Sequence, residues 1–385
     1  MEVDHCGLRR AEEKMADHHP AHKGAPSGAK RLAAQFRPID RFPVTHDPTL
    51  REFMDSIVGT GGQAGRLAGA VALWEAVLSR DRLVLCAISG APVPFGFGPA
   101  ICALGENHQI DVLDITGAQL SHDLLEILGA QHYRGSTELD DRTLASQDIN
   151  RFWDTLGDER DYRIPDSLMI EFVLGLPERP MTTREFLYRL GKYLLPRGQR
   201  PGILTAAAKV GLPIYCPALG DSVLGMDLGE VRVKTGKRVL LDVILDDLEM
   251  TALALLAEEL GGRTSVIIFG GGAPRNHVQQ TQVGSYMFQR SHLGHKEAVR
   301  FSLEPAETGG LSGSTISEGI SWKKFAPDVE AVEVFLDSNI ALGIVASVLN
   351  RDRANQITFE HNEDGTLTIE WKSQRLNVHH LFGLS

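Results

Sequence analysis

Residues 82–92 read RLVLCAISGAP, and this stretch decides the fold. After Arg82 the run is continuously apolar, as is typical of a strand that is covered on both faces in a parallel sheet. The residues from Ser89 to Pro92 are small or turn-forming, and such residues end strands. The stretch therefore predicts a buried strand whose carboxyl end meets a turn.

The sequence on both sides repeats this order of strand, turn and helix. Upstream, apolar residues at helical spacing predict helix between Thr49 and Ser79. Directly downstream we expect a helix at Gly98–Asn107, a strand at Ile110–Ile115, the turn Thr116–Ala118 and a helix at Ser121–Leu128. Later strands are expected at Leu212–Tyr215, Val239–Ile244, Ser265–Phe269 and Ala331–Leu336, and later helices at Thr182–Tyr193, Asp247–Leu260 and Ile340–Leu349.

These repeated units predict an α/β fold with a doubly wound, mostly parallel sheet and helices on both faces. Ligands of such sheets bind beyond the carboxyl ends of the strands. The residues expected at that edge include Ser89, Thr116, Gly270–Gly272 and Asp337. The three glycines allow a close backbone approach, but they are not the G-x-G-x-x-G dinucleotide fingerprint, and a structural turn also explains them.

Both ends of the chain differ from this pattern. Residues 1–36 are polar and rich in small residues, which predicts a mobile arm; its three histidines fit a solvated tail better than a metal site. Residues 356–361 and 366–371 alternate apolar and polar side chains around Asp364-Gly365, which predicts a half-solvated hairpin outside the main sheet and a possible oligomer contact. We therefore divide the chain into an arm (1–36), a catalytic domain (37–352) and a C-terminal extension (353–385).

Composition excludes several classes of function. The 385 residues carry 39 Lys+Arg against 50 Asp+Glu, a net charge of −11, which disfavours a nucleic-acid partner. No stretch approaches the roughly 18 apolar residues of a membrane helix, and the N-terminus lacks a secretory signal. The four cysteines are scattered, so neither a disulfide framework nor a cysteine zinc site is predicted. We expect a cytoplasmic protein that binds neither membrane nor metal.

The most informative loop reads GGLSGSTISEGISWKK and spans residues 309–324. Long loops rich in glycine and hydroxyl residues are often functional. A lysine beside Trp322 in a desolvated pocket can have a lowered pKa and form imines, and Glu318 can hold a cation. The simpler alternative is a surface lysine whose methylene chain lies over the tryptophan.

These residues and others resemble the bacterial branch of deoxyhypusine synthase-like proteins. The resemblance covers about Ile57 to Leu349. The segments that carry it, in the family's order, are TGAQLSHDLLE (116–126), HYRGS (132–136), VGLPIYCPALGD (210–221), GGGAPRN (270–276), TGGLSGSTISEGISWKK (308–324) and FLD (335–337).

The resemblance implies a tetrameric, Rossmann-like enzyme that uses NAD to oxidise spermidine. The enzyme releases 1,3-diaminopropane and carries the aminobutyl group as an imine on a lysine, whose place Lys324 occupies. The group then passes to an acceptor amine and is reduced by the same NADH. The acceptor is a protein lysine in deoxyhypusine synthases and putrescine in the related homospermidine synthases.

The resemblance also assigns site residues. Trp322 would pack on the polyamine chain, Glu318 and Asp221 would receive its ammonium groups, and Asn276 would contact the substrate. The NAD site would be lined by Ser89, Gly90, Thr116, Gly117, His122, Gly271, Asp337 and Ser338. Structural alternatives stay open, because Asp221 and Asp337 can cap a turn or helix and Thr116 can simply end a strand.

Several positions depart from the family's pattern. Asn276 stands where classical members have a catalytic histidine, and an asparagine amide cannot accept a proton from an amine; the base would be the adjacent His277, His122 or water. His122 replaces a glutamate. Leu311 and Met226 replace aspartates, which weakens or reshapes the recognition of a diamine. Lys323 replaces a glycine and either lowers the pKa of Lys324 or points to solvent.

These departures leave more than one function open. The leading hypothesis is an aminobutyl transferase with a small amine as acceptor. The alternatives are a deoxyhypusine synthase that acts on a protein lysine, a non-catalytic regulatory paralogue, and an enzyme for another amine donor, since a fold does not fix the substrate.

Overall fold

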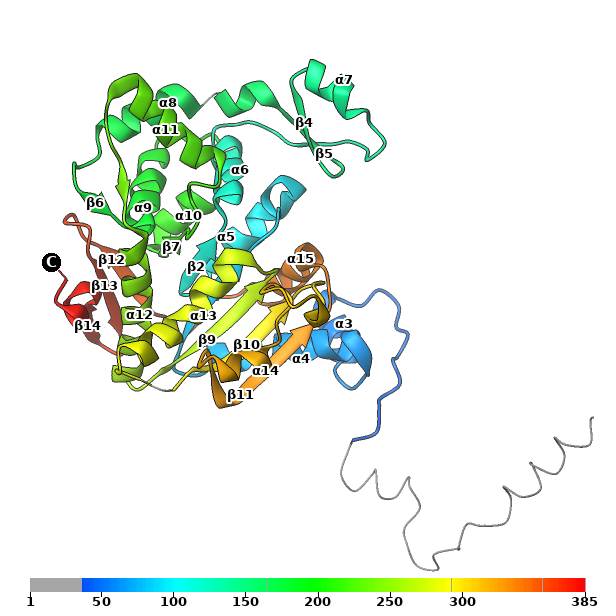
Figure 1. The fold of residues 1–385 in the computed structure, drawn as a ribbon. Coiled ribbons are helices and arrows are strands. Elements are labelled where there is room, and N and C mark those ends of the chain that lie inside the picture. Colours follow the sequence, from blue (N-terminus) through cyan, green and yellow to red (C-terminus); the bar gives the residue numbers. More distant parts are fainter. Residues whose placement is uncertain (1–36, 164, 292, 355, 385) are drawn as a thin grey trace, which may run out of the picture. The chain divides into compact units, whose positions relative to one another are not determined.

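The computed structural model describes residues 37–163, 165–291, 293–354 and 356–384, so the predicted arm at 1–36 lies outside the described residues. Two units are distinguished, residues 1–42 and 43–385. All described helices and strands belong to the second unit (Figure 1).

A six-stranded parallel sheet forms the centre of the second unit, in the order β11-β10-β9-β1-β2-β7. The chain enters at β1 in the middle, winds outward through β2 and β7, then crosses to β9 and winds the other way. This is the doubly wound topology that the sequence predicted, with its switch point between β1 and β9. The strands are β1 (Arg82–Ile88), β2 (Val112–Ile115), β7 (Ile214–Tyr215), β9 (Arg263–Phe269), β10 (His295–Phe301) and β11 (Phe325–Val334).

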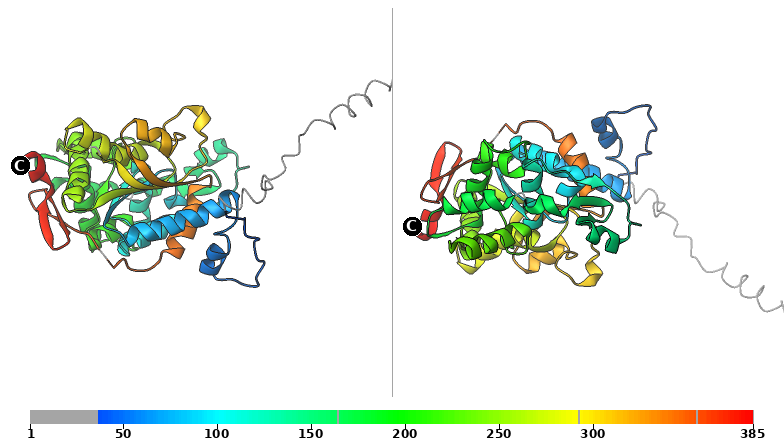
Figure 2. Two further views of the ribbon diagram at one scale, coloured as in Figure 1. Left: turned by 90° about the horizontal axis from the view of Figure 1, so that it is seen from below. Right: turned by 90° about the horizontal axis from the view of Figure 1, so that it is seen from above.

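Helices cover both faces of this sheet (Figure 2). Val84, Cys86 and Ile88 of β1 join one hydrophobic core, and the intervening Leu83 and Leu85 join the other. The first core includes residues of α4 (Gly62–Leu78), α5 (Gly98–Glu106), α6 (Gly117–Ile127) and α15 (Ser338–Val348), and the second includes residues of α12 (Val243–Glu259) and α13 (Gly272–Met287). Burial on both faces explains why β1 is apolar throughout.

The remaining elements surround this framework. The helices and helical turns are α3 (Leu50–Ser56), η1 (Val93–Phe97), α7 (Asp141–Ser146), η2 (Glu159–Arg163), α8 (Pro165–Leu174), α9 (Thr183–Leu194), α10 (Ile203–Val210), α11 (Val223–Thr235), η3 (Ala306–Thr308), α14 (Ile316–Ser321) and η4 (Val378–Phe382). An insert forms a small antiparallel sheet of β3 (Tyr133–Arg134), β5 (Thr155–Asp158) and β4 (Ile149–Phe152). No described helix is long and apolar enough to cross a membrane.

Several expected elements differ from the structure, and β11, expected at Ala331–Leu336, already begins at Phe325. The strand expected at Val239–Ile244 is wrong: only β8 (Leu240–Leu241) is extended, it pairs with β6 (Pro180–Met181), and α12 begins at Val243. The Asp242 carboxylate caps α12 by accepting from the backbone N–H of Leu245, which explains the early helix start. Similarly, α6 begins at Gly117 rather than at Ser121.

Strand β10 was not expected, because its sequence HKEAVRF is interrupted by charges. Glu297 is buried but accepts hydrogen bonds from Arg82, Arg80 and Ser265, each at 2.7 Å. A charged residue whose partners lie on other elements can occupy a central strand, although sequence periodicity does not reveal it.

The C-terminal extension forms a separate antiparallel sheet, as expected, of β12 (Thr358–His361), β13 (Leu367–Trp371) and β14 (Gln374–Asn377). The sheet is half-solvated, as expected: Leu367, Ile369 and Trp371 are buried in a core shared with α12, whereas Glu360 and Glu370 are exposed. Arg353, which is also buried, donates to both carboxylate oxygens of Asp111 at 3.0 and 2.9 Å. The boundaries at 36 and 352 stay predictions.

Candidate functional site

Lys324 lies in a cleft of about 330 Å³, which we call the lysine cleft. Lys324 is only 9% exposed, and its Nζ donates a hydrogen bond of 2.8 Å to Oδ1 of Asn276. The cleft is lined by one side of α13 and by the loop and short helix that precede β11. The lining residues are Asn276, Gln279, Gln280, Gly309, Gly310, Leu311, Ser314, Thr315, Glu318, Gly319, Trp322 and Lys324.

Burial lowers the pKa of Lys324, and the positive charge of Arg275 lowers it further, while Glu318 opposes the shift. Arg275 is fixed by hydrogen bonds to the carbonyl oxygens of Leu311 at 2.6 Å and Ser312 at 2.8 Å. A larger fraction of Lys324 is therefore neutral at physiological pH than for an exposed lysine. A neutral amine is the form that attacks a carbonyl or iminium carbon.

The neighbouring Lys323 is exposed and has a φ of +63°. This left-handed conformation favours glycine. Arg275, and not Lys323, contributes to the lowered pKa of Lys324. Of the two alternatives for Lys323, the structure supports the solvent-exposed one.

Trp322 and Glu318 lie at the mouth of the lysine cleft. Trp322 is 65% exposed, and Glu318 is exposed on α14. Leu311, 40% exposed, presents an apolar side chain to the same cleft. The opening therefore offers one carboxylate and an indole face, which suit an alkyl chain that carries an ammonium group.

The turns after β1 and β9 pack against each other at the switch point. The Ser89 hydroxyl donates to the carbonyl oxygen of Gly271, and the N–H of Gly272 donates to Ser312 Oγ at 3.0 Å. A Cβ on Gly271 would lie 2.5 Å from the Cβ of Ser312. The glycine triplet thus has a structural role, whereas the space around Gly90 (φ +86°) is open.

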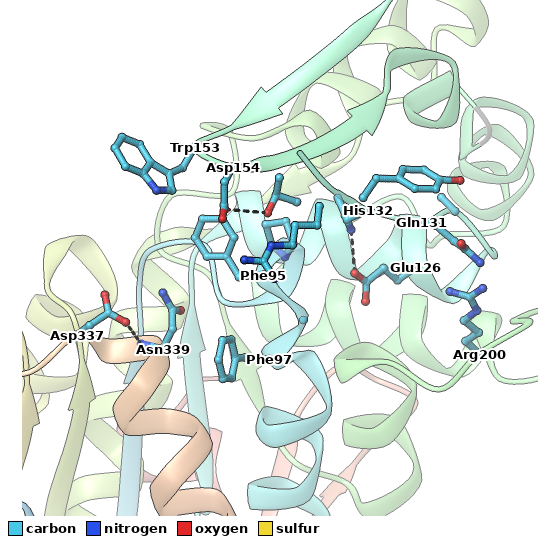
Figure 3. Close-up of a pocket in the computed structure, with 16 residues that line it drawn as sticks. Phe95, Phe97, Glu126, Gln131, His132, Trp153, Asp154, Arg200, Asp337 and Asn339 are labelled. Atoms are coloured by element: carbon cyan, nitrogen blue, oxygen red, sulfur yellow. Dashed lines mark hydrogen bonds and ion pairs between the residues drawn. The ribbon is translucent and has the colours of Figure 1, made fainter. Parts of the chain in front are cut away.

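A cavity of about 880 Å³, the edge cavity, lies next to the amino end of α15 (Figure 3). Asp337 lines it and caps α15, since Oδ1 accepts from the N–H groups of Asn339 and Ile340 at 2.9 and 3.1 Å; Ser338 is the first residue of that helix. Side chains at this cavity include Phe95, Phe97, Glu126, Gln131, His132, Trp153, Asp154, Arg200, Asp337 and Asn339.

Thr116 and Gly117 lie where β2 meets α6. Thr116 is the N-terminal cap residue of α6, but its Oγ1 is buried without a hydrogen-bond partner among the described residues, as is Oδ1 of Asn339. A Cβ on Gly117 would lie 2.7 Å from Ser222 Oγ, so packing alone requires glycine there.

His122 and Asp221 line a third cavity of about 650 Å³, the acidic cavity. His122 is buried, Asp221 is exposed, and Met226 is 68% exposed at the same cavity. The lining residues are Ala118, Ser121, His122, Asn150, Phe152, Glu159, Tyr162, Asp221, Ser222, Val223, Met226, Asp227 and Glu230. Among the described residues that line it there is no lysine or arginine.

His277 lines a smaller cavity of about 250 Å³ and not the lysine cleft, although Gln280 lines both. Its Nδ1 pairs with the buried Asp114, and its Nε2 lies 3.1 Å from Asp247. Burial disfavours the charged ring, but the Asp114 carboxylate outweighs it and raises the pKa of His277 to about 10. An imidazole that already holds its proton is poorly suited to act as a base.

The structure thus brings together Lys324, Asn276, Glu318 and Trp322, and places Asp221, His122 and His277 elsewhere in the same chain. Gln279 and Gln280 also line the lysine cleft but were not singled out from the sequence. Their positions three and four residues after Asn276, on one helix face, could have revealed them. Among the described residues, no group of three histidine, cysteine or acidic side chains could hold a metal ion.

Comparison with known proteins confirms the resemblance. A profile of the family described as "Deoxyhypusine synthase" matches residues 52–349. The chain is 38% identical over 315 residues to a "Probable deoxyhypusine synthase 2" of Methanosarcina mazei, covering 81% of this chain and 89% of that protein. It is 33% identical over 335 residues to a "Deoxyhypusine synthase-like protein" of a Nostoc species, covering 84% and 86%.

A solved structure shares the fold. The crystal structure of a putative deoxyhypusine synthase from Entamoeba histolytica aligns with a TM-score of 0.55 over 79% of this chain and 95% of that chain. The sequence identity is 16%, so this likeness concerns the fold alone.

Proposed function

The chain belongs to the deoxyhypusine synthase family, and from this we propose its function. It transfers the 4-aminobutyl group of spermidine, through an imine on Lys324, to a small acceptor amine. The observation that carries the proposal is the buried Lys324, with its lowered pKa, in a cleft whose mouth holds Glu318 and Trp322.

The residues of the lysine cleft suit this chemistry. Asn276 Oδ1 accepts from Nζ of Lys324, which orients the amine. The lowered pKa favours the neutral amine, whose lone pair forms the bond to the aminobutyl carbon. Trp322 would cover the methylene chain and Glu318 would receive the terminal ammonium group.

Members of this family are NAD-dependent, and the carboxyl edge of the sheet fits that cofactor. The buried, unpartnered oxygens of Thr116 and Asn339 offer hydrogen-bonding positions, and Gly90 leaves open space. The residues proposed to line the cofactor are Ser89, Gly90, Thr116, Gly117, His122, Gly271, Asp337 and Ser338. NAD would accept a hydride from the amine substrate and return it at the end of the reaction.

Asp221 lies in the acidic cavity and not in the lysine cleft. If Asp221 and Lys324 hold the same polyamine, a second copy of the chain must bring the two together. This requirement favours an oligomer; we propose the homotetramer that the family resemblance implies, in a cytoplasmic enzyme.

A small acceptor is favoured over a protein lysine because the site departs from the classical one. Leu311 and Met226 replace carboxylates, and Asn276 replaces a histidine. The alternatives are a deoxyhypusine synthase proper, or a regulatory paralogue without catalysis; the departures favour the paralogue, whereas Lys324, Trp322 and Glu318 argue against it.

Product analysis tests the proposal. The purified full chain is incubated with NAD and labelled spermidine, with either putrescine or a translation-factor substrate as acceptor. We expect 1,3-diaminopropane and an aminobutylated putrescine. Label on the protein acceptor instead would identify a deoxyhypusine synthase. No product, together with no binding of NAD, would support the paralogue.

A further inference from the structure

Glu126, His132 and His122 form a hydrogen-bonded chain that connects the edge cavity with the acidic cavity. Oε1 of Glu126 lies 2.8 Å from Nδ1 of His132 (Figure 3), and Nε2 of His132 lies 3.0 Å from Nδ1 of His122. Glu126 and His132 line the edge cavity, and His122 lines the acidic cavity. The sequence-based roles include neither Glu126 nor His132.

With a neutral His132, the chemistry of these groups assigns the hydrogen positions. A carboxylate can only accept, so Nδ1 of His132 donates to Glu126. Nε2 of a neutral His132 then accepts, and Nδ1 of His122 must be the donor. The hydroxyl oxygen of Tyr162 also contacts Nδ1 of His122, at 3.2 Å. The other nitrogen of His122, Nε2, is left with a lone pair.

The His122 ring is held in this orientation. The Phe152 ring lies edge-on to it, with centroids 4.7 Å apart and planes at 87°. No hydrogen bond from the described residues reaches Nε2 of His122. His122 is more than nine-tenths buried and lines the acidic cavity, and its Nε2 is the ring nitrogen left for a ligand.

The acidic cavity suits a cation. Titratable groups come to it from three places: Glu159 and Tyr162 on η2, Asp221 before α11, and Asp227 and Glu230 on α11. Burial lowers the pKa of His122 to about 4. His122 is therefore neutral at physiological pH.

We propose that Nε2 of His122 accepts the proton of an alkylammonium ligand in the acidic cavity, with His132 and Glu126 as positioning residues. The N–H bond of the ammonium breaks and an N–H bond to Nε2 forms, so the ligand becomes a neutral amine and the charge passes to the imidazole. Glu126 stabilises this charge through His132, in the manner of a carboxylate behind a catalytic histidine.

This inference rests on the proposed function and deepens it. An amine must lose its proton before a hydride can leave the adjacent carbon, because the nitrogen lone pair stabilises the resulting iminium. Asn276 cannot take that proton, and His277 lies between two carboxylates in another cavity. His122 supplies a base with an open nitrogen.

Kinetics of His122→Ala test the proposal in the full chain with NAD, spermidine and putrescine. We expect a loss of rate of about 10²- to 10⁴-fold, the usual contribution of a general base. Added imidazole and higher pH should each restore part of the rate, and Glu126→Gln should shift the pH–rate profile. The exposed His380 provides a control, and His380→Gln should behave as wild type. An unchanged rate in His122→Ala, or a loss relieved by neither imidazole nor pH, would overturn the proposal.

A second measurement does not depend on activity. In protein labelled with ¹⁵N-histidine, the His122 signals are assigned by their absence from His122→Ala. We expect hydrogen on Nδ1 and none on Nε2, and we expect putrescine to shift the Nε2 resonance. Hydrogen on Nε2 in the wild-type chain would overturn the relay. If the wild-type chain forms no product but has the expected tautomer, the proposed aminobutyl transfer is wrong, whereas the assignment of Nε2 of His122 as a proton acceptor is retained.

Discussion

Glu249 on α12 connects the C-terminal sheet to the core, and Glu249→Gln should destabilise the fold. Its carboxylate is fully buried and accepts from Nε of Arg184 at 3.0 Å, from the Tyr215 hydroxyl at 2.8 Å and from His379 of the extension. Burial alone would raise the pKa of Glu249, but the charge of Arg184 and the hydrogen bonds outweigh it and lower the pKa to about 2.

The magnitude follows from this shift. The ordinary pKa is 4.5, so the folded state favours the ionised form by 4.5 − 2 pH units, which at about 1.4 kcal/mol per unit is roughly 3–4 kcal/mol. A depressed carboxyl pKa stabilises the fold above pH 4.5, and this stability is lost as the pH falls from 4.5 toward 2. Breaking a buried ion pair on one side costs about 3–5 kcal/mol, which agrees.

The assay is urea unfolding at pH 7, followed by circular dichroism and tryptophan fluorescence, with a series of wild-type measurements down to pH 3. Glu249→Gln should lower the free energy of unfolding by about 3 kcal/mol and weaken its dependence on pH below 4.5. Glu360→Gln is the control, because Glu360 pairs with Arg375 on the surface and should contribute less than about 1 kcal/mol. Equal losses in the two variants would refute the reasoning.

Three further substitutions test the packing around the site. Gly271→Ala should lower the free energy of unfolding by about 1–3 kcal/mol in urea titrations, because its Cβ would collide with Ser312; no loss would contradict the tight switch-point turn. The raised pKa of His277 stabilises the fold below pH 6.5, and this stability is lost as the pH rises toward 10; the wild-type free energy of unfolding should fall over that range, and His277→Gln should fall less. Lys323→Gly should raise the melting temperature slightly, by relieving about 1 kcal/mol of left-handed strain, and a lower melting temperature would be evidence against that strain.

Much of the fold could be predicted from strands whose own sequence shows that they are buried. Strand β1 is apolar after Arg82 and β9 is apolar from Val266 to Phe269, because helices cover both faces of the sheet, and the turns after these strands contain Ser89 and the glycine triplet. Strand β10 was not predicted, because the arginines that neutralise the charge of its Glu297 are distant in the sequence. Such compensation is a tertiary property and leaves no local pattern.

The candidate site divides in the same way. Lys324, Trp322 and Glu318 lie within one short helix and the turn after it, so their proximity in the sequence already predicts that they line one cleft. His277 adjoins Asn276 in sequence, but neighbours on a helix point about 100° apart, and it lies in another cavity. His122 and Glu126 lie four residues apart on α6, but His132, which connects them, follows that helix, and its position could not be predicted from the sequence alone.

The central claim is that Lys324 carries the aminobutyl group. The most direct test is the intact mass of the full chain after incubation with NAD and spermidine and trapping with cyanoborohydride, for wild type, Lys324→Ala and Lys323→Gly. An aminobutyl adduct on wild type and Lys323→Gly, and none on Lys324→Ala, is the predicted result. An adduct that persists in Lys324→Ala, or none on wild type although NAD binds, would contradict the account.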